Sequence, residues 1–290
     1  MTDIIASPST RRLAREKDVD VDALAKRLGR TTIAPEDLDE TPGATPGDTT
    51  LWDVDHAAFG AISEEPMSRF AQVAARNMAA AQALIPAVTH HDSADVSALD
   101  AFRQALKSEA QARGVKLTAL AFHVAALARC LRQYSRFNAS LSSDAQRLIL
   151  KDYVHIGIAV DTRHGLMVPV IRNADRKGLW QIAAEIADLA ARAQARKIKP
   201  DEMGGASMTI TNLGGIGGAA FTPIVNPPEV AILGITRTRT ATAWYGDTPR
   251  PVPMVPLDLS YDHRVINGAD AARFMTHYCG LIAEPRNMLI

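Results

Sequence analysis

His263 is the residue of this sequence best suited to act as a general base. It lies in the run Ser-Tyr-Asp-His-Arg-Val-Ile-Asn-Gly at residues 260–268. Residues 257–261 alternate between apolar and polar types, which predicts a strand, and residues 269–278 are rich in helix formers. His263 is therefore predicted to lie between a strand and a helix, where backbone polar groups are free and Gly268 permits close approach. A single histidine in such a place is more often an ordinary turn residue, so a catalytic role must be argued from the whole run of residues around it.

A second strand is predicted to end in a glycine-rich turn. Residues 208–218 read Met-Thr-Ile-Thr-Asn-Leu-Gly-Gly-Ile-Gly-Gly. The stretch lacks the Lys-Ser/Thr pair of a phosphate-binding loop and does not lead into a predicted helix, which disfavours a nucleotide-binding loop. Taken alone, Thr211 is a strand threonine whose hydroxyl is satisfied by its neighbours.

The spacing of histidines and cysteines does not favour a metal site. His90 and His91 are neighbours on a predicted strand, so their side chains point to opposite faces and cannot bind one ion together. Cys130 and Cys279 form neither a disulfide framework nor a metal-ligand pattern, which is typical of a reducing compartment and predicts a cytoplasmic protein.

Other elements follow from the hydrophobic pattern. The almost wholly apolar residues 117–133 predict a buried helix, in which His123 is a hydrogen-bonded core histidine rather than a catalyst. Further helices are predicted at 68–83, 96–113 and 179–197, and a hairpin-like pair of strands at 153–171.

Composition limits the possible classes of protein. The 290 residues, 47% of them hydrophobic, are enough for one large domain with a buried core and a small second one. The 32 basic and 32 acidic residues give no net charge, which argues against nucleic acid and acidic membrane surfaces as partners. No apolar run approaches the roughly twenty residues that cross a bilayer, and the first residues resemble no targeting signal.

The run around His263 resembles the active-site signature Asp-His-Arg-x-x-Asp/Asn-Gly of the dihydrolipoamide acyltransferases, the E2 components of 2-oxoacid dehydrogenase complexes. The resemblance extends from about Trp52 to Ile290, and the form of residues 212–218 is most similar to pyruvate-type bacterial members. It implies an α/β (α+β two-layer) fold, the chloramphenicol acetyltransferase-like E2 catalytic domain, at residues 51–290. It also implies transfer of an acyl group, expected to be acetyl, between dihydrolipoamide and coenzyme A, with no metal.

The same resemblance implies roles for individual residues. His263 removes the thiol proton of coenzyme A, Thr211 donates its hydroxyl to the oxyanion, and Asn267 positions Arg264 or the local backbone, since an amide cannot act as acid or base. Most members of the family have Asp at the position of Asn267. The residues expected to bind the substrate or coenzyme A are Arg103, Asp161, Lys177 and Arg264. For Arg103 and Lys177 the alternative is an ordinary surface charge.

Residues 5–40 carry a second resemblance. Ser-Pro-x-x-Arg-Arg-Leu-Ala-Arg-Glu, followed by Val-Asp, is similar to the peripheral subunit-binding domain that holds the E1 or E3 enzyme. Its basic contact face comprises Arg11, Arg12 and Arg15. Residues 26–31 keep only one glycine of the family's glycine-rich loop, and a helical extension packed on the main body is the alternative. Residues 41–50, with prolines, glycines and threonines, predict a flexible linker.

The resemblance further implies a homotrimer with His263 of one subunit facing Thr211 of the next, and docking of the apolar C-terminal residues between trimers into a larger core. The lipoyl group is expected from another chain, because nothing before Ser7 resembles a lipoyl domain. A noncatalytic core or tethering subunit that binds E1 or E3 is the alternative function. Chloramphenicol-type acetylation is disfavoured, because the His-His-x-x-x-Asp-Gly form does not occur.

Overall fold

The computed structural model describes residues 5–16, 21, 24–25, 31–34, 53–163 and 165–288. The chain divides into two compact units, residues 1–66 and 67–290. The altered glycine loop at 26–30, the predicted linker at 41–50 and the last two residues lie outside the described residues.

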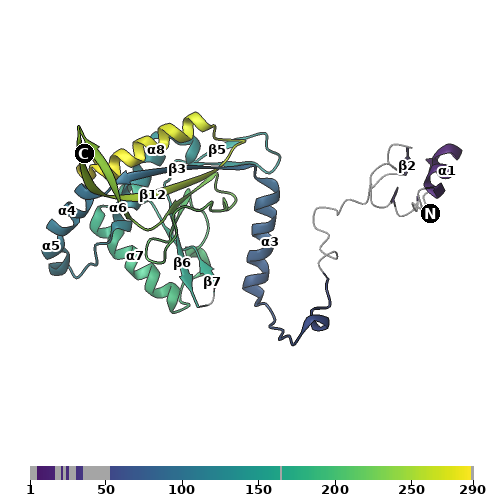
Figure 1. Cartoon of the computed structure of the whole chain (residues 1–290), viewed down its shortest axis with the longest axis horizontal. Coiled ribbons are helices and arrows are strands. Elements are labelled where there is room, and N and C mark those ends of the chain that lie inside the picture. Colours follow the sequence, from purple (N-terminus) through teal and green to yellow (C-terminus); the bar gives the residue numbers. More distant parts are fainter. Residues whose placement is uncertain are drawn as a thin grey trace. The chain divides into compact units, whose positions relative to one another are not determined.

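The first unit contains the helix α1 (Pro8–Glu16), the short 3₁₀ helix η3 (His56–Phe59) and a pair of short parallel strands, β1 (Ile5–Ala6) and β2 (Thr32–Ile33) (Figure 1). The Ser7 hydroxyl caps the start of this helix, because it accepts a hydrogen bond from the Thr10 backbone N–H at 3.1 Å. The buried hydrophobic residues described in this unit are Ala14, Leu24, Ala25 and Ile33. The three arginines Arg11, Arg12 and Arg15 are exposed on α1.

A mixed eight-stranded sheet organises the second unit. Its order is β11-β12-β10-β9-β6-β7, with β3 paired to β12 and β8 paired to β6. β9 runs parallel to both β10 and β6, and the other pairs are antiparallel. The strands are β3 (Ala87–Asp95), β6 (Ile156–Thr162), β7 (Gly165–Met167), β8 (Val170–Ile171), β9 (Met208–Asn212), β10 (Ala231–Ile235), β11 (Arg239–Tyr245) and β12 (Thr248–Asp262). A separate small sheet pairs β4 (Ala139–Leu141) with β5 (Leu148–Leu150).

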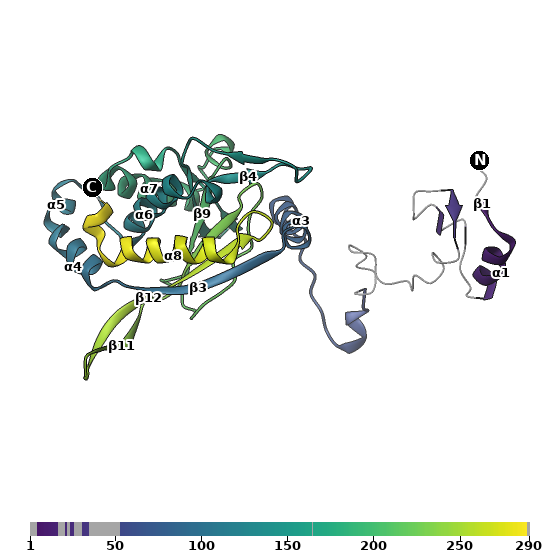
Figure 2. The same cartoon turned by 90° about the horizontal axis from the view of Figure 1, so that it is seen from above.

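Helices α6, α7 and α8 form a second layer that packs against this sheet, and the main hydrophobic core lies between the two layers (Figure 2). The helices of this unit are α3 (Arg69–Leu84), α4 (Ser97–Ala105), α5 (Lys107–Ala112), α6 (Ala119–Gln133), α7 (Leu179–Gln194) and α8 (Gly268–Ala283). The helix predicted at 96–113 is two helices that meet at Leu106, which packs against the core together with Phe102. Among the described residues, no helix has the length and apolar character needed to span a membrane.

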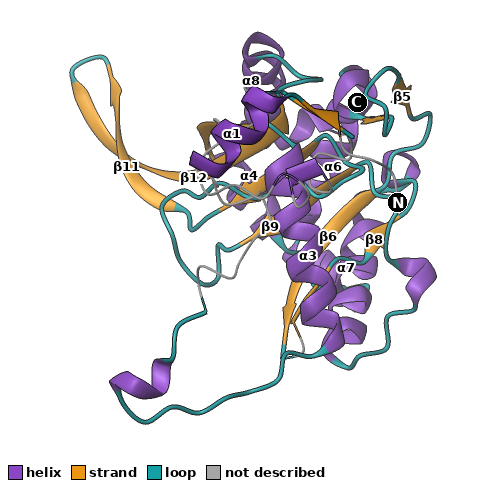
Figure 3. Cartoon of the chain, turned by 90° about the vertical axis from the view of Figure 1, so that its right-hand side faces the viewer, coloured by secondary structure: helices purple, strands orange, loops and turns teal. Residues whose placement is uncertain are grey.

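Strand β12 is the most heavily paired element of the sheet. Its first half forms a hairpin with β11 that projects from the rest of the unit (Figures 2 and 3). Its second half lies between β3 and β10. The predicted alternation is present, but both faces are covered: Leu257 and Leu259 are fully buried, and Asp258 and Ser260 on the other face are only 1% exposed. In β12 the alternation therefore separates a buried apolar face from a buried polar face. The polar side chains can be buried because they have hydrogen-bond partners.

His123 lies in the core, as predicted. It is 3% exposed, and its Nδ1 is 2.6 Å from the hydroxyl of Tyr278 on α8. Desolvation by burial lowers the pKa of His123 from 6.5 to about 4. In the folded protein the imidazole is therefore neutral near pH 7, and its hydrogen bond to Tyr278 connects α6 to α8.

Burial of His123 makes stability depend on pH. Because its folded-state pKa lies below the unfolded value, the unfolded chain takes up the proton first as the pH falls. Relative to a His123→Gln variant, which keeps a hydrogen-bonding side chain but cannot titrate, the wild type should lose on the order of 3 kcal/mol of unfolding free energy between about pH 6.5 and pH 4. Denaturant unfolding of both proteins across this range measures the difference. If the unfolding free energies of the two proteins change equally with pH, the pKa of His123 is not lowered in the folded state.

Candidate active site

His263 lies directly after β12 and before α8, as predicted. Its backbone N–H donates a hydrogen bond to the carbonyl of Pro86 at 3.1 Å, which fixes the main chain at this junction. The imidazole is exposed, and its ring centre lies 5.8 Å from that of Tyr261. A side chain with a fixed backbone and solvent access is suited to exchanging a proton with a bound thiol.

The turn that carries His263 is organised by Asp262, whose side chain is 3% exposed. Asp262 accepts hydrogen bonds from the backbone N–H of Arg264 at 3.0 Å and from its guanidinium at 2.7–3.2 Å. These hydrogen bonds raise the pKa of Arg264. The guanidinium is thus held against Asp262, although 40% of the side chain remains exposed. Sequence reasoning gave Asp262 no role, although its place in the signature was a signal.

Asn267 is the N-cap of α8. Its Oδ1 accepts a hydrogen bond from the backbone N–H of Asp270 at 2.8 Å. The amide therefore fixes the start of α8, four residues after His263, and its role at the site stays a prediction. Its hydrogen bond goes to the helix, whereas Arg264 is paired with Asp262.

Thr211 lines a largely apolar cavity of about 760 Å³. The cavity lies among α3, β6, β7, β9 and the segment after the glycine-rich turn. Its lining comprises Phe70, Ala71, Val73, Ala74, Asn77, Met78, Ala159, Gly165, Leu166, Met167, Val168, Met203, Gly204, Thr209, Thr211, Phe221, Pro223, Ile224, Asn226 and Ile232. A hydroxyl in such a cavity is a hydrogen-bond donor in surroundings with little competing water.

His263 does not line this cavity, and the sheet register explains the separation. Thr211 is opposite Gly234, Gly234 is opposite Asp258, and His263 lies five residues beyond Asp258. At about 3.3 Å per residue and about 4.8 Å per strand, Thr211 and His263 of one chain are on the order of 15–20 Å apart. A thiol and an oxyanion on one carbon must each lie within about 3 Å of their partners, so these two side chains of one chain cannot share a reacting centre.

Glu229 is buried behind the cavity wall and was not singled out in the sequence. Its Oε1 accepts a hydrogen bond from the hydroxyl of Thr209 at 2.9 Å, and Thr209 lines the cavity two residues before Thr211. Its Oε2 has no hydrogen-bond partner among the described residues. Desolvation by burial raises the pKa of Glu229 from 4.5 to about 7.

The predicted substrate-binding residues Arg103 and Asp161 lie on different elements. Arg103, on α4, donates to Asp100 at 3.1 Å, while its Nε is buried and has no hydrogen-bond partner in the part of the chain that is described. Asp161 is exposed near the end of β6, and strand alternation places it on the same face as Ala159, which lines the Thr211 cavity.

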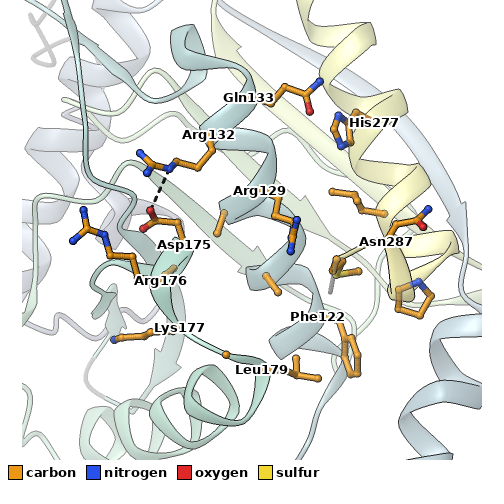
Figure 4. Close-up of a pocket in the computed structure, with 17 residues that line it drawn as sticks. Phe122, Arg129, Arg132, Gln133, Asp175, Arg176, Lys177, Leu179, His277 and Asn287 are labelled. Atoms are coloured by element: carbon orange, nitrogen blue, oxygen red, sulfur yellow. Dashed lines mark ion pairs between the residues drawn. The ribbon is translucent and has the colours of Figure 1, made fainter. Parts of the chain in front are cut away.

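Lys177 lies at another cavity, of about 860 Å³, which neither Thr211 nor His263 lines (Figure 4). Its ammonium group is paired with Glu185. The cavity also carries Arg132, which forms an ion pair with Asp175 at 3.2 Å. Lys177 therefore lies at a cavity that none of the other predicted site residues lines.

The two neighbouring histidines of β3 point to opposite faces, as predicted. His91 faces Asp258, with its Nδ1 2.6 Å from a carboxylate oxygen. Within the described residues, no three His, Cys, Asp or Glu side chains are grouped so that they could hold a metal ion.

Comparisons with known proteins identify the family. Residues 60–290 match the model for the 2-oxoacid dehydrogenases acyltransferase catalytic domain. The dihydrolipoyllysine-residue acetyltransferase component of the pyruvate dehydrogenase complex of Azotobacter vinelandii is 46% identical over 98% of this chain and 47% of its own length. The same component of Pseudomonas aeruginosa is 44% identical over 98% of this chain and 55% of its own. The chain thus spans about half the length of these curated relatives.

Solved structures agree with this match. A crystal structure of the Azotobacter vinelandii dihydrolipoamide acetyltransferase, from a study of a serine, a histidine and an asparagine in its catalytic mechanism, is 51% identical. Its TM-score is 0.80, over 82% of this chain and 98% of that one. The cubic core of a pyruvate dehydrogenase multienzyme complex matches equally well, with a TM-score of 0.80. The class is an α/β catalytic domain of the E2 type, as the sequence predicted. The chain belongs to the 2-oxoacid dehydrogenase acyltransferase family.

The buried carboxyl of Glu229 should make stability fall as the pH rises. Its folded-state pKa lies above the unfolded value, so the unfolded chain loses the proton first. Relative to Glu229→Gln, which can still accept the Thr209 hydrogen bond, the wild type should lose on the order of 3 kcal/mol of unfolding free energy from about pH 4.5 to about pH 7. This trend opposes that of His123 over much of the same range, so each is measured against its own variant. A difference that does not change with pH would refute a raised pKa.

Proposed function

We propose that this chain transfers an acetyl group between dihydrolipoamide and coenzyme A, as the pyruvate-type E2 component does. One observation carries the proposal. In the Azotobacter vinelandii enzyme, the serine, histidine and asparagine studied for their catalytic roles are separated by fifty-two and then four residues. Thr211, His263 and Asn267 have the same two separations. A hydroxyl, an imidazole and an amide are therefore present in the same order and register, with threonine in place of serine.

The chemistry of these groups suits transfer between two thiols. Neutral His263 removes the proton from the coenzyme A thiol, because the thiolate is the effective nucleophile. The thiolate attacks the carbonyl carbon of acetyl-dihydrolipoamide, and the resulting oxyanion accepts a hydrogen bond from the Thr211 hydroxyl. The intermediate then expels the dihydrolipoamide thiolate, which takes the proton back from His263. Asn267 and Asp262 hold the turn and the helix end that carry the imidazole.

The site is proposed to form between two copies of the chain. The separation of Thr211 and His263 within one sheet supports this arrangement, because the Thr211 cavity needs a base from outside its own chain. A homotrimer meets this need. Its threefold symmetry repeats one interface three times, so each subunit gives its His263 to one neighbour and receives His263 from the other. Assembly of trimers into a larger core is proposed from the relative that forms a cubic core.

Further contacts complete the proposal. Arg103 and Arg264, whose side chains are 34% and 40% exposed, would bind phosphate oxygens of coenzyme A. Asp161 would form part of the wall near Thr211. Lys177 lines the second cavity, which none of these residues lines, and would bind coenzyme A there. The exposed arginines of α1 would contact E1 or E3.

Replacement of either reacting side chain should remove transfer while leaving the fold intact. His263→Ala should lower kcat by at least about a hundredfold, the range typical of a lost general base. Thr211→Ala should lose roughly 3 kcal/mol of transition-state stabilisation, about a hundredfold in kcat. Thr211→Ser keeps the hydroxyl and should stay near the wild-type rate. The assay is transfer from acetyl-CoA to free dihydrolipoamide. Absence of transfer by the wild type would instead favour a noncatalytic core or tethering subunit.

Mixed oligomers test the shared site directly. Subunits carrying His263→Ala and subunits carrying Thr211→Ala are co-expressed with different tags, and oligomers that contain both are purified. In a trimer that contains both kinds of subunit, one of the three interfaces pairs an intact histidine with an intact threonine, so about a third of wild-type activity should return. The matched control is a double variant, His263→Ala with Thr211→Ala on one chain, mixed with wild type. Mixed single variants that stay as inactive as their parents would show that each site lies within one chain.

A further inference from the structure

One row of side chains crosses the face of the sheet that carries Thr211. The register places His91 of β3 opposite Asp258 of β12, Asp258 opposite Gly234 of β10, and Gly234 opposite Thr211 of β9. Residues in register on neighbouring strands point to the same face. The His91–Asp258 pair therefore lies on the Thr211 face of the sheet, with only the glycine position between it and the threonine.

The carboxylate of Asp258 is buried and has a partner on each oxygen. Its side chain is 1% exposed, and Oδ1 lies 2.6 Å from Nδ1 of His91, whose side chain is 49% exposed. Oδ2 accepts a hydrogen bond from the backbone N–H of Phe221 at 3.2 Å. A buried carboxylate needs such donors, and here one of them belongs to the segment that follows the glycine-rich turn.

Phe221 connects this carboxylate to the proposed reaction site. Its ring lies against the bare backbone of Gly234, because a Cβ added there would come within 2.7 Å of two ring atoms. The ring also lines the cavity of Thr211. The position of this wall is thus set from one side by the missing side chain of Gly234 and from the other by Asp258, which holds the Phe221 main chain.

We propose that Asp258, held by His91, is a positioning residue for acetyl transfer, because it fixes the Phe221 backbone and thereby the wall of the Thr211 cavity. The inference rests on the proposed function. Asp258 touches no reacting atom in this arrangement and acts through Phe221. A wall held to within a fraction of an ångström keeps the thioester carbonyl in line with the Thr211 hydroxyl, and looser positioning lowers the rate of the chemical step.

Three variants separate positioning from general stability. Asp258→Ala removes both hydrogen bonds. Asp258→Asn can keep them, since the amide oxygen accepts from Phe221 and the amide nitrogen donates to the imidazole. Ser260→Ala is the matched control: it removes the 2.7 Å hydrogen bond to Thr89, the next pair on the same face of the same two strands, without touching Phe221.

Two readouts are measured on the purified chain of 290 residues. The first is hydrogen exchange at the Phe221 amide. Asp258→Ala should speed exchange there at least about tenfold, while Asp258→Asn and Ser260→Ala leave it near the wild-type rate. The second is acetyl transfer. Asp258→Ala should lower kcat roughly tenfold, with KM changed less than about twofold, and Asp258→Asn should restore kcat to within about twofold.

The outcomes distinguish this inference from the proposed function. Wild-type transfer with an unchanged kcat in Asp258→Ala, or an equal loss in Ser260→Ala, overturns the positioning role and leaves the proposed function standing. Unchanged exchange at Phe221 in Asp258→Ala overturns the hydrogen-bond clamp whatever the activity. Absence of transfer by the wild type overturns the proposed function and, with it, the catalytic part of this inference.

Discussion

The pairing of β12 between β3 and β10 is the constraint on which the rest of the structure depends. This strand ends at Asp262, so its register fixes where His263 leaves the sheet. The same register places Asp258 two strands from Thr211. A slip of one residue would turn every side chain of β12 to the opposite face, exchanging Leu257 and Leu259 for charged and polar groups in the core. The buried apolar face therefore sets the geometry of both halves of the site.

With that register, the proposed function needs a site formed between subunits. A base just after one strand and a hydroxyl near the end of another, two strands away, are held by one rigid sheet and cannot be brought together by side-chain rotation. A loop movement would have to break the hydrogen bond from His263 to Pro86 and the contacts of Asp262. Cyclic symmetry can instead bring the His263 surface of one subunit against the Thr211 surface of the next without breaking these hydrogen bonds. The proposed site between subunits thus follows from the stiffness of the sheet.

Sequence patterns predicted most of this arrangement, and their failures have physical causes. The strand-to-helix junction at His263, the buried His123 and the α/β family were predicted, because periodicity and local motifs report local structure. The partners of Asp258 and Glu229 were not, because they join positions far apart in the chain: Phe221 lies 37 residues from Asp258, and His91 lies 167 residues away. Alternation in β12 indicated a polar face, and only the tertiary fold shows that this face is covered.

Three buried acids illustrate how the fold divides its polar groups. Asp258 and Asp262 are each enclosed by strong donors, namely backbone N–H groups together with an imidazole or a guanidinium, and each fixes a segment that bears on the site. Glu229 has a hydroxyl on one oxygen and no partner among the described residues on the other, and burial raises its pKa to about 7. The donors of Asp258 and Asp262 fix the segments that carry them, whereas desolvation makes the Glu229 carboxyl harder to ionise. The wall of the Thr211 cavity is therefore supported by one group of each kind, through Phe221 on one side and Thr209 on the other.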